Sequence, residues 1–294
     1  MTRLLITGGA TGFGKAMALC WAKHHQNNNT PLRICIADIH QERGQETINE
    51  LKALGAEALF SECDITNISQ IKSTQALVTR EWQGVDIVIN NAGVATGGSL
   101  KSESFEQWQW VFNINLFGMV QMSQVFVDVF REQGHGYFIN VASQAGVTPV
   151  PLMGSYNAVK AAVVSFSETM KLELASDNID VSVVCPSFFK THLNESMKTS
   201  EPIMKESVNR LFAKAEMTAE QVAHSVYQQA QDKRFLILTH KQGKLAYFMK
   251  KFLPCNTYLN RVIASTAKMV SRAKQASNQA SNQSSNLTSK KKEQ

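Results

Sequence analysis

The chain has 294 residues, 44% of them apolar, and a formal net charge of +6. That length and apolar share allow a substantial buried core, so we expect a globular fold of enzyme size in one large or two ordinary domains. No stretch approaches the ~18 to 20 apolar residues that span a bilayer, which excludes an integral membrane protein. The excess of positive charge is concentrated after residue 240, which argues against a nucleic-acid-binding face.

The five cysteines show no metal-ligand or CxxC spacing, so we interpret them as small core hydrophobes and expect no metal site. A strand-like run starts at residue 3, without a charged leader or an extended apolar segment before it. We therefore expect a protein that is not exported, with reduced thiols in a cytoplasmic location.

Seven short apolar runs, at residues 4–7, 33–37, 57–60, 87–90, 137–141, 181–185 and 235–238, alternate with stretches of helical period. The helical stretches include residues 14–24, 42–54, 68–81, 105–130 and 156–175. This alternation is typical of repeated βαβ units. It predicts an α/β fold in which residues 1–240 form a single doubly wound, Rossmann-like domain with a seven-stranded parallel sheet and helices on both faces.

The first strand leads into a glycine-rich turn, TGGATGFG at residues 7–14, that opens a helix. Gly8, Gly12 and Gly14 permit a tight turn and a close approach of the backbone, and the helix N-terminus favours an anion such as the pyrophosphate of a dinucleotide. A strand-to-helix turn without a ligand is the alternative. The position after the first strand of a βαβ unit favours nucleotide binding, with Thr11 and Phe13 in the same turn.

The second strand ends at Asp38, 24 positions after Gly14 and close to the spacing of about 20 expected for the acid that binds the adenosine ribose. Its carboxylate would hold a 2′-hydroxyl and repel a 2′-phosphate, which favours NAD(H). Arg43 lies about a turn away and offsets part of that repulsion, so NADP(H) is not excluded. The alternative role for Asp38 is a helix N-cap.

Further along the chain, Tyr156 and Lys160 are four residues apart, on one face of a predicted helix. An adjacent ammonium favours the phenolate, so a tyrosine with an ordinary pKa of about 10 would exchange protons nearer neutrality. The alternative is an aromatic ring packed on the core beside a solvated lysine. Ser143 ends the apolar strand upstream, where open α/β sheets bind ligands, and this favours an acid/base site.

Two later segments depart from the βαβ rhythm. Residues 186–217 form an apolar, irregular insertion between the sixth and seventh strands, which predicts a substrate loop or lid. Residues 241–274 are basic and amphipathic and predict a helical extension, whereas residues 275–294 are polar and repetitive and predict a disordered tail.

Four motifs together resemble the short-chain dehydrogenase/reductase family over roughly residues 3–240: the glycine-rich turn, Asn-Asn-Ala-Gly at residues 90–93, Ser143, and Tyr156-x-x-x-Lys160. The resemblance implies that Tyr156 exchanges a proton with the substrate oxygen while hydride passes between nicotinamide and a carbonyl carbon. Lys160 would then bind the nicotinamide ribose and lower the phenol pKa, and Ser143 would bind the substrate oxygen.

The same resemblance assigns further residues. Asn115 matches the helix-bending asparagine that holds a relay water near the lysine, with Asn113 the weaker candidate. Asn91 matches a residue that supports the sheet and the adenosine side, and Asp64 matches the adenine contact. The implied cofactor-binding set is Gly8, Thr11, Gly12, Phe13, Gly14, Asp38, Asp64, Ile65, Asn91, Ala92, Gly93, Tyr156, Lys160, Pro186 and Thr191.

The chain departs from the family pattern at two places. Ser187 follows Pro186 where the family has glycine, although Thr191 still fits the threonine that meets the carboxamide. Some 50 residues also follow the last strand. This extension would obstruct tetramer contacts along that strand, so a homodimer formed by the helices at 105–130 and 156–175 is expected, and a tetramer stays open.

The substrate side is apolar, with Met153, Phe188 and Phe189 as expected substrate contacts beside Ser143 and Tyr156, and no arginine cluster for a phosphate or carboxylate. A hydrophobic, lipid-like alcohol or carbonyl compound is favoured. A fatty-acyl or acyl-carrier reductase is the alternative enzyme, and a catalytically silent dinucleotide sensor or scaffold is the alternative outside enzymes. The extension packs on the domain or a partner subunit, or it rests on an anionic membrane surface.

Overall fold

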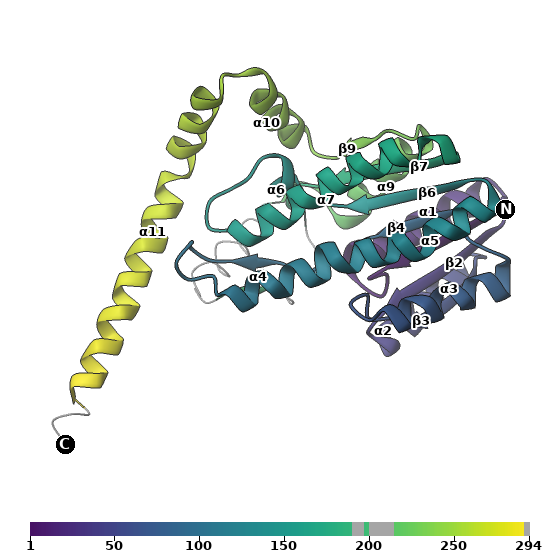
Figure 1. Ribbon diagram of the computed structural model, residues 1–294, viewed down its shortest axis with the longest axis horizontal. Helices are drawn as coiled ribbons and strands as arrows, with labels where there is room; N and C mark the ends of the chain where they lie inside the picture. The colour runs from purple at the N-terminus through teal and green to yellow at the C-terminus, as the bar shows by residue number, and fades with distance from the viewer. Residues whose placement is uncertain (190–196, 200–214, 291–294) are drawn as a thin grey trace.

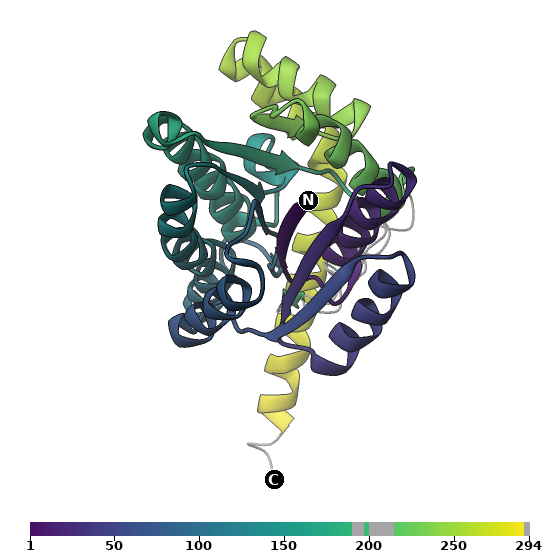
Figure 2. The same cartoon turned by 90° about the vertical axis from the view of Figure 1, so that its right-hand side faces the viewer.

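The computed structural model describes residues 1–189, 197–199 and 215–290. A seven-stranded, fully parallel sheet forms its centre, in the order β3-β2-β1-β4-β6-β7-β9 (Figures 1 and 2). This confirms the predicted fold class and number of strands. The strands are β1 (Thr2–Thr7), β2 (Leu32–Asp38), β3 (Glu57–Glu62), β4 (Ile87–Asn90), β6 (Gly136–Val141), β7 (Ile179–Cys185) and β9 (Leu236–Leu238).

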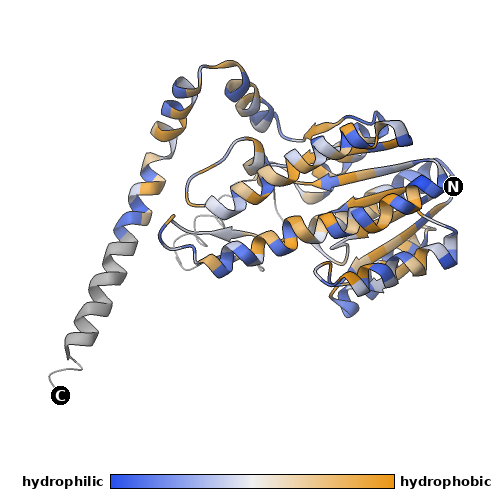
Figure 3. Cartoon of the chain, in the orientation of Figure 1, coloured by the Kyte–Doolittle hydropathy of each residue, from blue (hydrophilic) through white to orange (hydrophobic). Residues whose placement is uncertain are grey.

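Helices cover both faces of the sheet because successive strand side chains point to opposite faces. In β1, Leu4 and Ile6 belong to the core on one face, whereas Leu5 belongs to the core on the other. The first core is closed by α1 (Gly12–Asn27), α2 (Gln41–Ala53) and α9 (Ala219–Gln231). The second is closed by α3 (Ile68–Trp82), α5 (Met119–Gln133) and α7 (Gly154–Glu173). Figure 3 shows the apolar strands between these layers.

The long helix predicted over residues 105–130 is divided by a short π-helical segment. Its parts are α4 (Phe105–Phe112), the π-helix η1 (Asn113–Gly118) and α5. A capping box between Ser104 and Gln107 starts α4. Gly118 ends η1 where a Cβ would come within 2.8 Å of the Ile65 side chain, so only glycine fits that approach without a shift. The π-helical segment places Asn115 at the bend.

Smaller elements complete the carboxyl-end edge of the sheet. A two-stranded parallel sheet joins β5 (Thr96–Gly97) to β8 (Lys198–Thr199), and α6 (Gln144–Val147) follows β6 directly. A 3-10 turn, η2 (Ala175–Asp177), connects α7 to β7. The β5–β8 pairing ties the segment that follows β7 to the loop that follows β4.

The C-terminal extension consists of two helices, α10 (Lys241–Phe252) and α11 (Cys255–Lys290), the second of which leads away from the domain (Figure 1). The helix over residues 275–290 differs from the disorder predicted from their composition. No glycine or proline occurs between residues 255 and 290, so nothing interrupts the helical hydrogen bonds there. None of the helices among the described residues is both long and apolar enough to cross a bilayer.

The helix α10 is attached to α6. The Gln144 amide donates to the carbonyl oxygen of Gly243 (3.2 Å), and the Lys250 ammonium donates to the carbonyl oxygen of Val147 (2.7 Å). The Tyr247 ring packs against the core that contains Val147. One side of α10 therefore packs on the domain, next to the strand end that carries Ser143.

Candidate active site

A cleft with a volume of about 1310 Å³ lies along the carboxyl ends of the strands. Residues that follow β1, β2, β3, β4, β6 and β7 line it. It spans the point between β1 and β4 where the strand order reverses, which is where doubly wound sheets bind ligands. Because pockets for small molecules measure roughly 300 to 1,000 Å³, this cleft has room for a dinucleotide and a substrate together.

The glycine-rich turn forms one wall of the cleft and fits a pyrophosphate. Gly8 and Gly12 have φ values of +64° and +56°, a region in which side chains are strained. A Cβ at Gly14 would overlap the carbonyl oxygen of Gly8, so α1 approaches the strand end closely only because glycine is there. The N-terminus of α1 then faces the cleft with its backbone N–H groups.

Asn91 holds this turn in place. Its side-chain amide donates to the carbonyl oxygens of Thr7 (3.0 Å) and Gly8 (3.1 Å). The Thr7 hydroxyl accepts from the backbone N–H groups of Asn91 (3.0 Å) and Ala92 (3.1 Å). Asn91 thus supports this end of the sheet, as expected. Together with Ala92 and Gly93 it also lines the cleft.

The Asp38 carboxylate is nearly buried at the end of β2 and lines the cleft with Arg43. It accepts hydrogen bonds from the backbone N–H groups of Ala10 (2.9 Å) and His40 (3.0 Å). The residue at the N-cap of α2 is His40, which makes no side-chain cap bond, so the alternative role of Asp38 as that helix's N-cap is wrong. Its carboxylate instead joins the glycine-rich turn to the second strand.

Asp64 and Ile65 line the cleft beyond β3. The Asp64 carboxylate accepts from the backbone N–H (2.9 Å) and the hydroxyl (2.8 Å) of Thr66. Across the cleft, Pro186 lies after β7, and its carbonyl oxygen accepts from the Gln144 N–H (2.8 Å). Thr191 lies outside the described residues.

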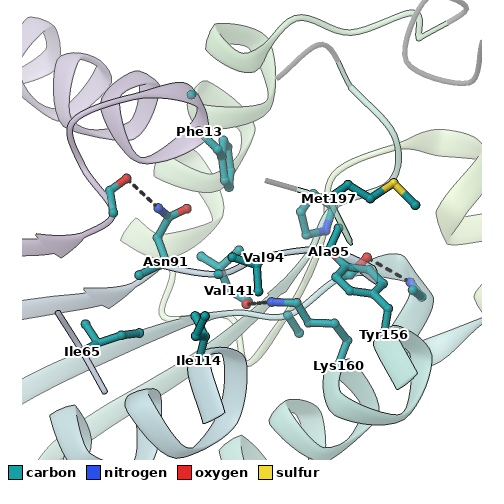
Figure 4. Close-up of a pocket in the computed structure, with 18 of the residues that line it drawn as sticks. Phe13, Ile65, Asn91, Val94, Ala95, Ile114, Val141, Tyr156, Lys160 and Met197 are labelled. Carbon is teal, nitrogen blue, oxygen red and sulfur yellow. Dashed lines mark hydrogen bonds between the residues drawn. The ribbon is translucent and has the colours of Figure 1, made fainter. Parts of the chain in front are cut away.

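Ser143, Tyr156 and Lys160 all line the cleft, as the sequence predicted. Figure 4 shows Tyr156 and Lys160 side by side there. Ser143 precedes α6 and its hydroxyl accepts from the Ala145 N–H (3.1 Å). The phenol of Tyr156, two residues into α7, lies near the Ser143 hydroxyl, which acts to lower the phenol pKa. The Lys160 ammonium, one turn later, donates to the carbonyl oxygen of Val141 (3.0 Å) and lies 5.9 Å from the centre of the Tyr156 ring.

Burial dominates the electrostatics of this pair. It raises the pKa of Tyr156 to about 12, against the opposing hydrogen bond from Ser143. It also lowers the pKa of Lys160 to about 8. Contrary to the prediction, Lys160 therefore does not lower the pKa of the Tyr156 phenol. Both groups are out of water, and the ammonium is directed to the Val141 carbonyl and not to the phenol oxygen.

Asn115 is fully buried in η1 and reaches across to the loop after β4. Its side-chain amide donates to the Val94 carbonyl oxygen (2.8 Å), and its side-chain oxygen accepts from the Val94 N–H (2.7 Å). A Cβ at Gly93 would lie 2.8 Å from that oxygen and 3.6 Å from the Lys160 nitrogen, so these three residues are neighbours. Asn113, the weaker candidate, lines the cleft from the same segment.

A buried polar cluster positions the start of α7. The Glu103 carboxylate accepts from the Ser155 backbone N–H (3.0 Å) and from its hydroxyl (2.8 Å). The same hydroxyl is 2.6 Å from that of Thr96. Ser155 directly precedes Tyr156, so this cluster fixes the turn from which the phenol enters the cleft. The sequence alone gave no signal for it.

The apolar half of the cleft includes Met153, Phe188 and Phe189, the expected substrate contacts. The Phe189 ring packs edge-on against Phe13, with centres 4.9 Å apart, so it closes the cleft toward α1. Sequence reasoning missed Trp110, which lines the same half and has the Lys198 ammonium 4.0 Å above its ring. The described part of the predicted substrate loop is 186–189, 197–199 and 215–217.

The sequence and the fold were compared with known proteins. Residues 2–202 match the family described as short chain dehydrogenase. The chain is 29% identical over 257 residues to the CLA biosynthesis dehydrogenase/reductase of Lactiplantibacillus plantarum, which covers 81% of this chain and 88% of that protein. It is 30% identical over 220 residues to the 3-oxoacyl-[acyl-carrier-protein] reductase FabG of Thermotoga maritima, covering 74% and 86%.

Among solved structures, a short chain dehydrogenase/reductase from Burkholderia phymatum in complex with NAD superposes with a TM-score of 0.78 at 27% identity, over 85% of this chain and 93% of that one. The family match covers more than half of the chain, and the sheet order and motif positions agree with it. The chain therefore belongs to the short-chain dehydrogenase/reductase family of oxidoreductases.

Proposed function

We propose that this protein transfers a hydride between a nicotinamide cofactor and the carbonyl or alcohol carbon of a hydrophobic, lipid-like substrate, with Tyr156 as general acid and base. The observation that carries the proposal is the convergence of Ser143, Tyr156 and Lys160 in a cleft whose other wall is a glycine-rich turn. The nicotinamide ring, when bound, supplies or accepts the hydride.

Each residue has a separate role in this proposal. The Tyr156 hydroxyl gives a proton to the substrate oxygen during reduction and takes one back during oxidation. The Ser143 hydroxyl, which lies near that phenol, donates to the same oxygen as negative charge develops on it. The Lys160 ammonium, which points into the cleft from α7, holds the nicotinamide ribose. Asn115 keeps the bend of η1 beside the lysine, where a relay water would pass the proton to solvent.

NAD(H) is the proposed cofactor. The Asp38 carboxylate lines the cleft at the end of β2, and its remaining lone pairs are acceptors for ribose hydroxyls. A 2′-phosphate would lie against that negative charge, although Arg43 lines the same part of the cleft. We therefore expect Kd for NADPH to exceed that for NADH, and an Asp38→Ser variant to narrow the difference. Equal affinities of the unaltered protein for the two cofactors would contradict this preference.

A hydrophobic substrate is supported by the apolar half of the cleft, where Trp110, Val150, Met153 and Phe188 face the site. The alternative, an acyl-carrier or fatty-acyl reductase, is supported by the 3-oxoacyl-[acyl-carrier-protein] reductase among the relatives. A panel of free ketones and alcohols of graded chain length, assayed beside 3-oxoacyl thioesters on carrier protein and on coenzyme A, separates the two. Reduction of carrier-bound thioesters alone would favour the alternative.

The decisive variant is Tyr156→Phe, which removes the phenol hydroxyl and keeps the ring. We expect turnover to be lost and the affinity for NADH to be retained, measured by stopped assays and by titration calorimetry. The matched control is Tyr137→Phe, since the Tyr137 hydroxyl is buried against Ser182 (2.6 Å) and does not line the cleft.

Undiminished turnover in Tyr156→Phe would refute the acid/base role. If the unaltered protein binds NADH but turns over nothing in the panel, that result would favour the alternative of a catalytically silent dinucleotide sensor or scaffold.

We propose a homodimer formed by the helices α4 to α5 and α7. Large apolar side chains are exposed there, with Phe105 at 72%, Phe117 at 50% and Leu172 at 80% exposure. Light scattering after gel filtration should report two chains for the unaltered protein and one chain for Leu172→Glu. The control Leu100→Glu, at an exposed position outside these helices, should still give two chains. Four chains would favour the tetramer.

The outer side of α10 supports a peripheral membrane contact as a second role of the extension. Leu245, Phe248 and Phe252 are 63%, 51% and 72% exposed there, next to the exposed Lys251. Anionic vesicles should sediment the full chain but not a Phe248→Ser/Phe252→Ser variant. If neither binds, packing on the domain is the whole role of α10. The five cysteines are free thiols, which supports a reducing, cytoplasmic location.

A further inference from the structure

A cluster of three metal-binding side chains lies outside the cleft, where α1 packs against α9. Cys20 and His24 come from α1 and His224 comes from α9. The thiol sulfur and one imidazole nitrogen from each histidine all lie within 4.8 Å of one another. From this geometry we propose that the cluster is a zinc site that joins the two helices.

The helix α1 supplies two ligands from one face. Cys20 and His24 are four residues apart, so their side chains lie one turn apart on the same side of the helix. This side faces α9, because the His24 ring stacks on the Tyr227 ring of that helix, with centres 4.0 Å apart. The third ligand therefore comes from the facing helix and needs no rearrangement of the backbone to reach the other two.

The two histidines already have their ring nitrogens turned toward each other. His24 Nε2 and His224 Nδ1 are 3.1 Å apart. In a tetrahedral site with Zn–N distances of about 2.0 to 2.1 Å, two ligand nitrogens are about 3.3 Å apart. The observed separation is thus within a few tenths of an ångström of that in a zinc site, and a rotation of the two rings would direct both nitrogens to one ion.

Neighbouring rings hold the histidines in this arrangement. The His24 ring stacks on the Tyr227 ring, with centres 4.0 Å apart and an interplanar angle of 6°, and lies nearly parallel to the His224 ring, with centres 5.2 Å apart and an angle of 12°. Tyr227 in turn packs edge-on against Trp21 at 5.0 Å. Metal sites bind tightly when their ligands are fixed in place before the ion arrives, and this stack provides such a support.

The ligand set selects the ion. One thiolate and two imidazoles suit zinc, which takes four ligands in tetrahedral geometry, and the hard ions magnesium and calcium prefer oxygen. His224 is exposed, so water can supply the fourth ligand. On binding, the Cys20 S–H bond breaks, a sulfur–zinc bond forms and the proton passes to the buffer, with no change in oxidation state.

The sequence spacing of the cysteines gave no sign of this site, and the expectation was that no metal is bound. The reason is that His24 and His224 are 200 positions apart, so only the packing of α1 on α9 brings them together. The ion would fasten the helix that carries the glycine-rich turn to the helix before β9, which makes its proposed role structural.

The test uses the full chain, freed of metal with a chelator that is then removed by dialysis. We expect it to bind one zinc per chain, to melt at a higher temperature with zinc, and to give with cobalt the absorption of a thiolate-bound tetrahedral ion. His224→Gln, at an exposed position, and Cys20→Ala should each lose the stoichiometric binding and the thiolate absorption.

Two variants are the matched controls. His25→Gln alters the neighbouring histidine, whose ring is bonded to Thr30 (2.8 Å), and Cys255→Ser alters the exposed cysteine. Both should bind zinc as the unaltered chain does. Zinc bound equally by His224→Gln, binding without the thiolate absorption, or no zinc retained by the unaltered chain would each overturn the proposal. If Cys20→Ala fails to fold, the His224→Gln result decides.

Discussion

The buried ammonium of Lys160 makes the stability of the protein depend on pH in a way that can be measured. Lys160 is 4% exposed, and its charge is held in a site whose low polarity lowers its pKa to about 8. Replacing it with methionine, which has a similar shape and no charge, removes this titration. The variant also leaves the Val141 carbonyl without its donor, at a cost of about 1 to 3 kcal/mol that does not vary with pH.

The magnitude follows from the two pKa values. The unfolded lysine titrates at 10.5 and the folded one at about 8. Between these values the unfolded chain binds more protons than the folded chain, so the free energy of unfolding rises with pH. At about 1.4 kcal/mol for each pKa unit, the whole rise is about 3 kcal/mol, of which roughly 2.5 kcal/mol is gained between pH 7 and pH 10. The methionine variant lacks this gain.

The assay is chemical unfolding without dinucleotide, followed by tryptophan fluorescence at both pH values. We expect the stability of the unaltered protein relative to Lys160→Met to increase by roughly 2 to 3 kcal/mol from pH 7 to pH 10. Lys72→Met, which removes an exposed lysine of α3, is the control and should leave the difference the same at both pH values. A difference for Lys160→Met that is equal at pH 7 and pH 10 would refute the argument that burial governs this ammonium.

Three further substitutions test contacts around the cleft. Glu103→Gln replaces the carboxylate that accepts two hydrogen bonds from Ser155 with an amide that also donates. It should lower kcat while the Kd for NADH changes by less than about threefold, which is under about 1 kcal/mol. An unchanged kcat would count against the positioning role of Glu103. Gly14→Ala places a methyl group on the Gly8 carbonyl, so calorimetry should show loss of NADH binding; full affinity would contradict the cradle described for the pyrophosphate. Phe189→Ala removes the ring that packs on Phe13 and should destabilise the fold by about 3 kcal/mol in thermal or urea unfolding, whereas a change below about 1 kcal/mol would mean that the ring contributes little.

Much of the sheet could be predicted because its signals are local. The alternation in β1, with Leu5 on one face and its neighbours on the other, follows from side-chain period alone. The glycine-rich turn and the Tyr156–Lys160 spacing are also local patterns, and each lies in the cleft where the fold class places ligands. Local patterns therefore specified both the architecture and the centre of the site.

The parts that could not be predicted depend on residues distant in sequence. Glu103 reaches Ser155 across 52 positions, and no periodicity or motif marks that pair. The π-helical segment that contains Asn115 packs Gly118 closely against Ile65, a residue far upstream in the sequence. The pKa values of Tyr156 and Lys160 depend on how completely the surrounding elements exclude water, which spacing along a helix does not reveal.

The attachment of α10 to α6 has a consequence for annotation and for protein engineering. The family match ends at residue 202. Helix α6, which follows Ser143, is nevertheless hydrogen-bonded at both of its ends to residues of α10, after position 202. Alignments restricted to the matched region therefore omit part of what shapes the neighbourhood of Ser143. Affinity tags or fusion partners belong after α11, and shortened versions should keep every residue through Phe252.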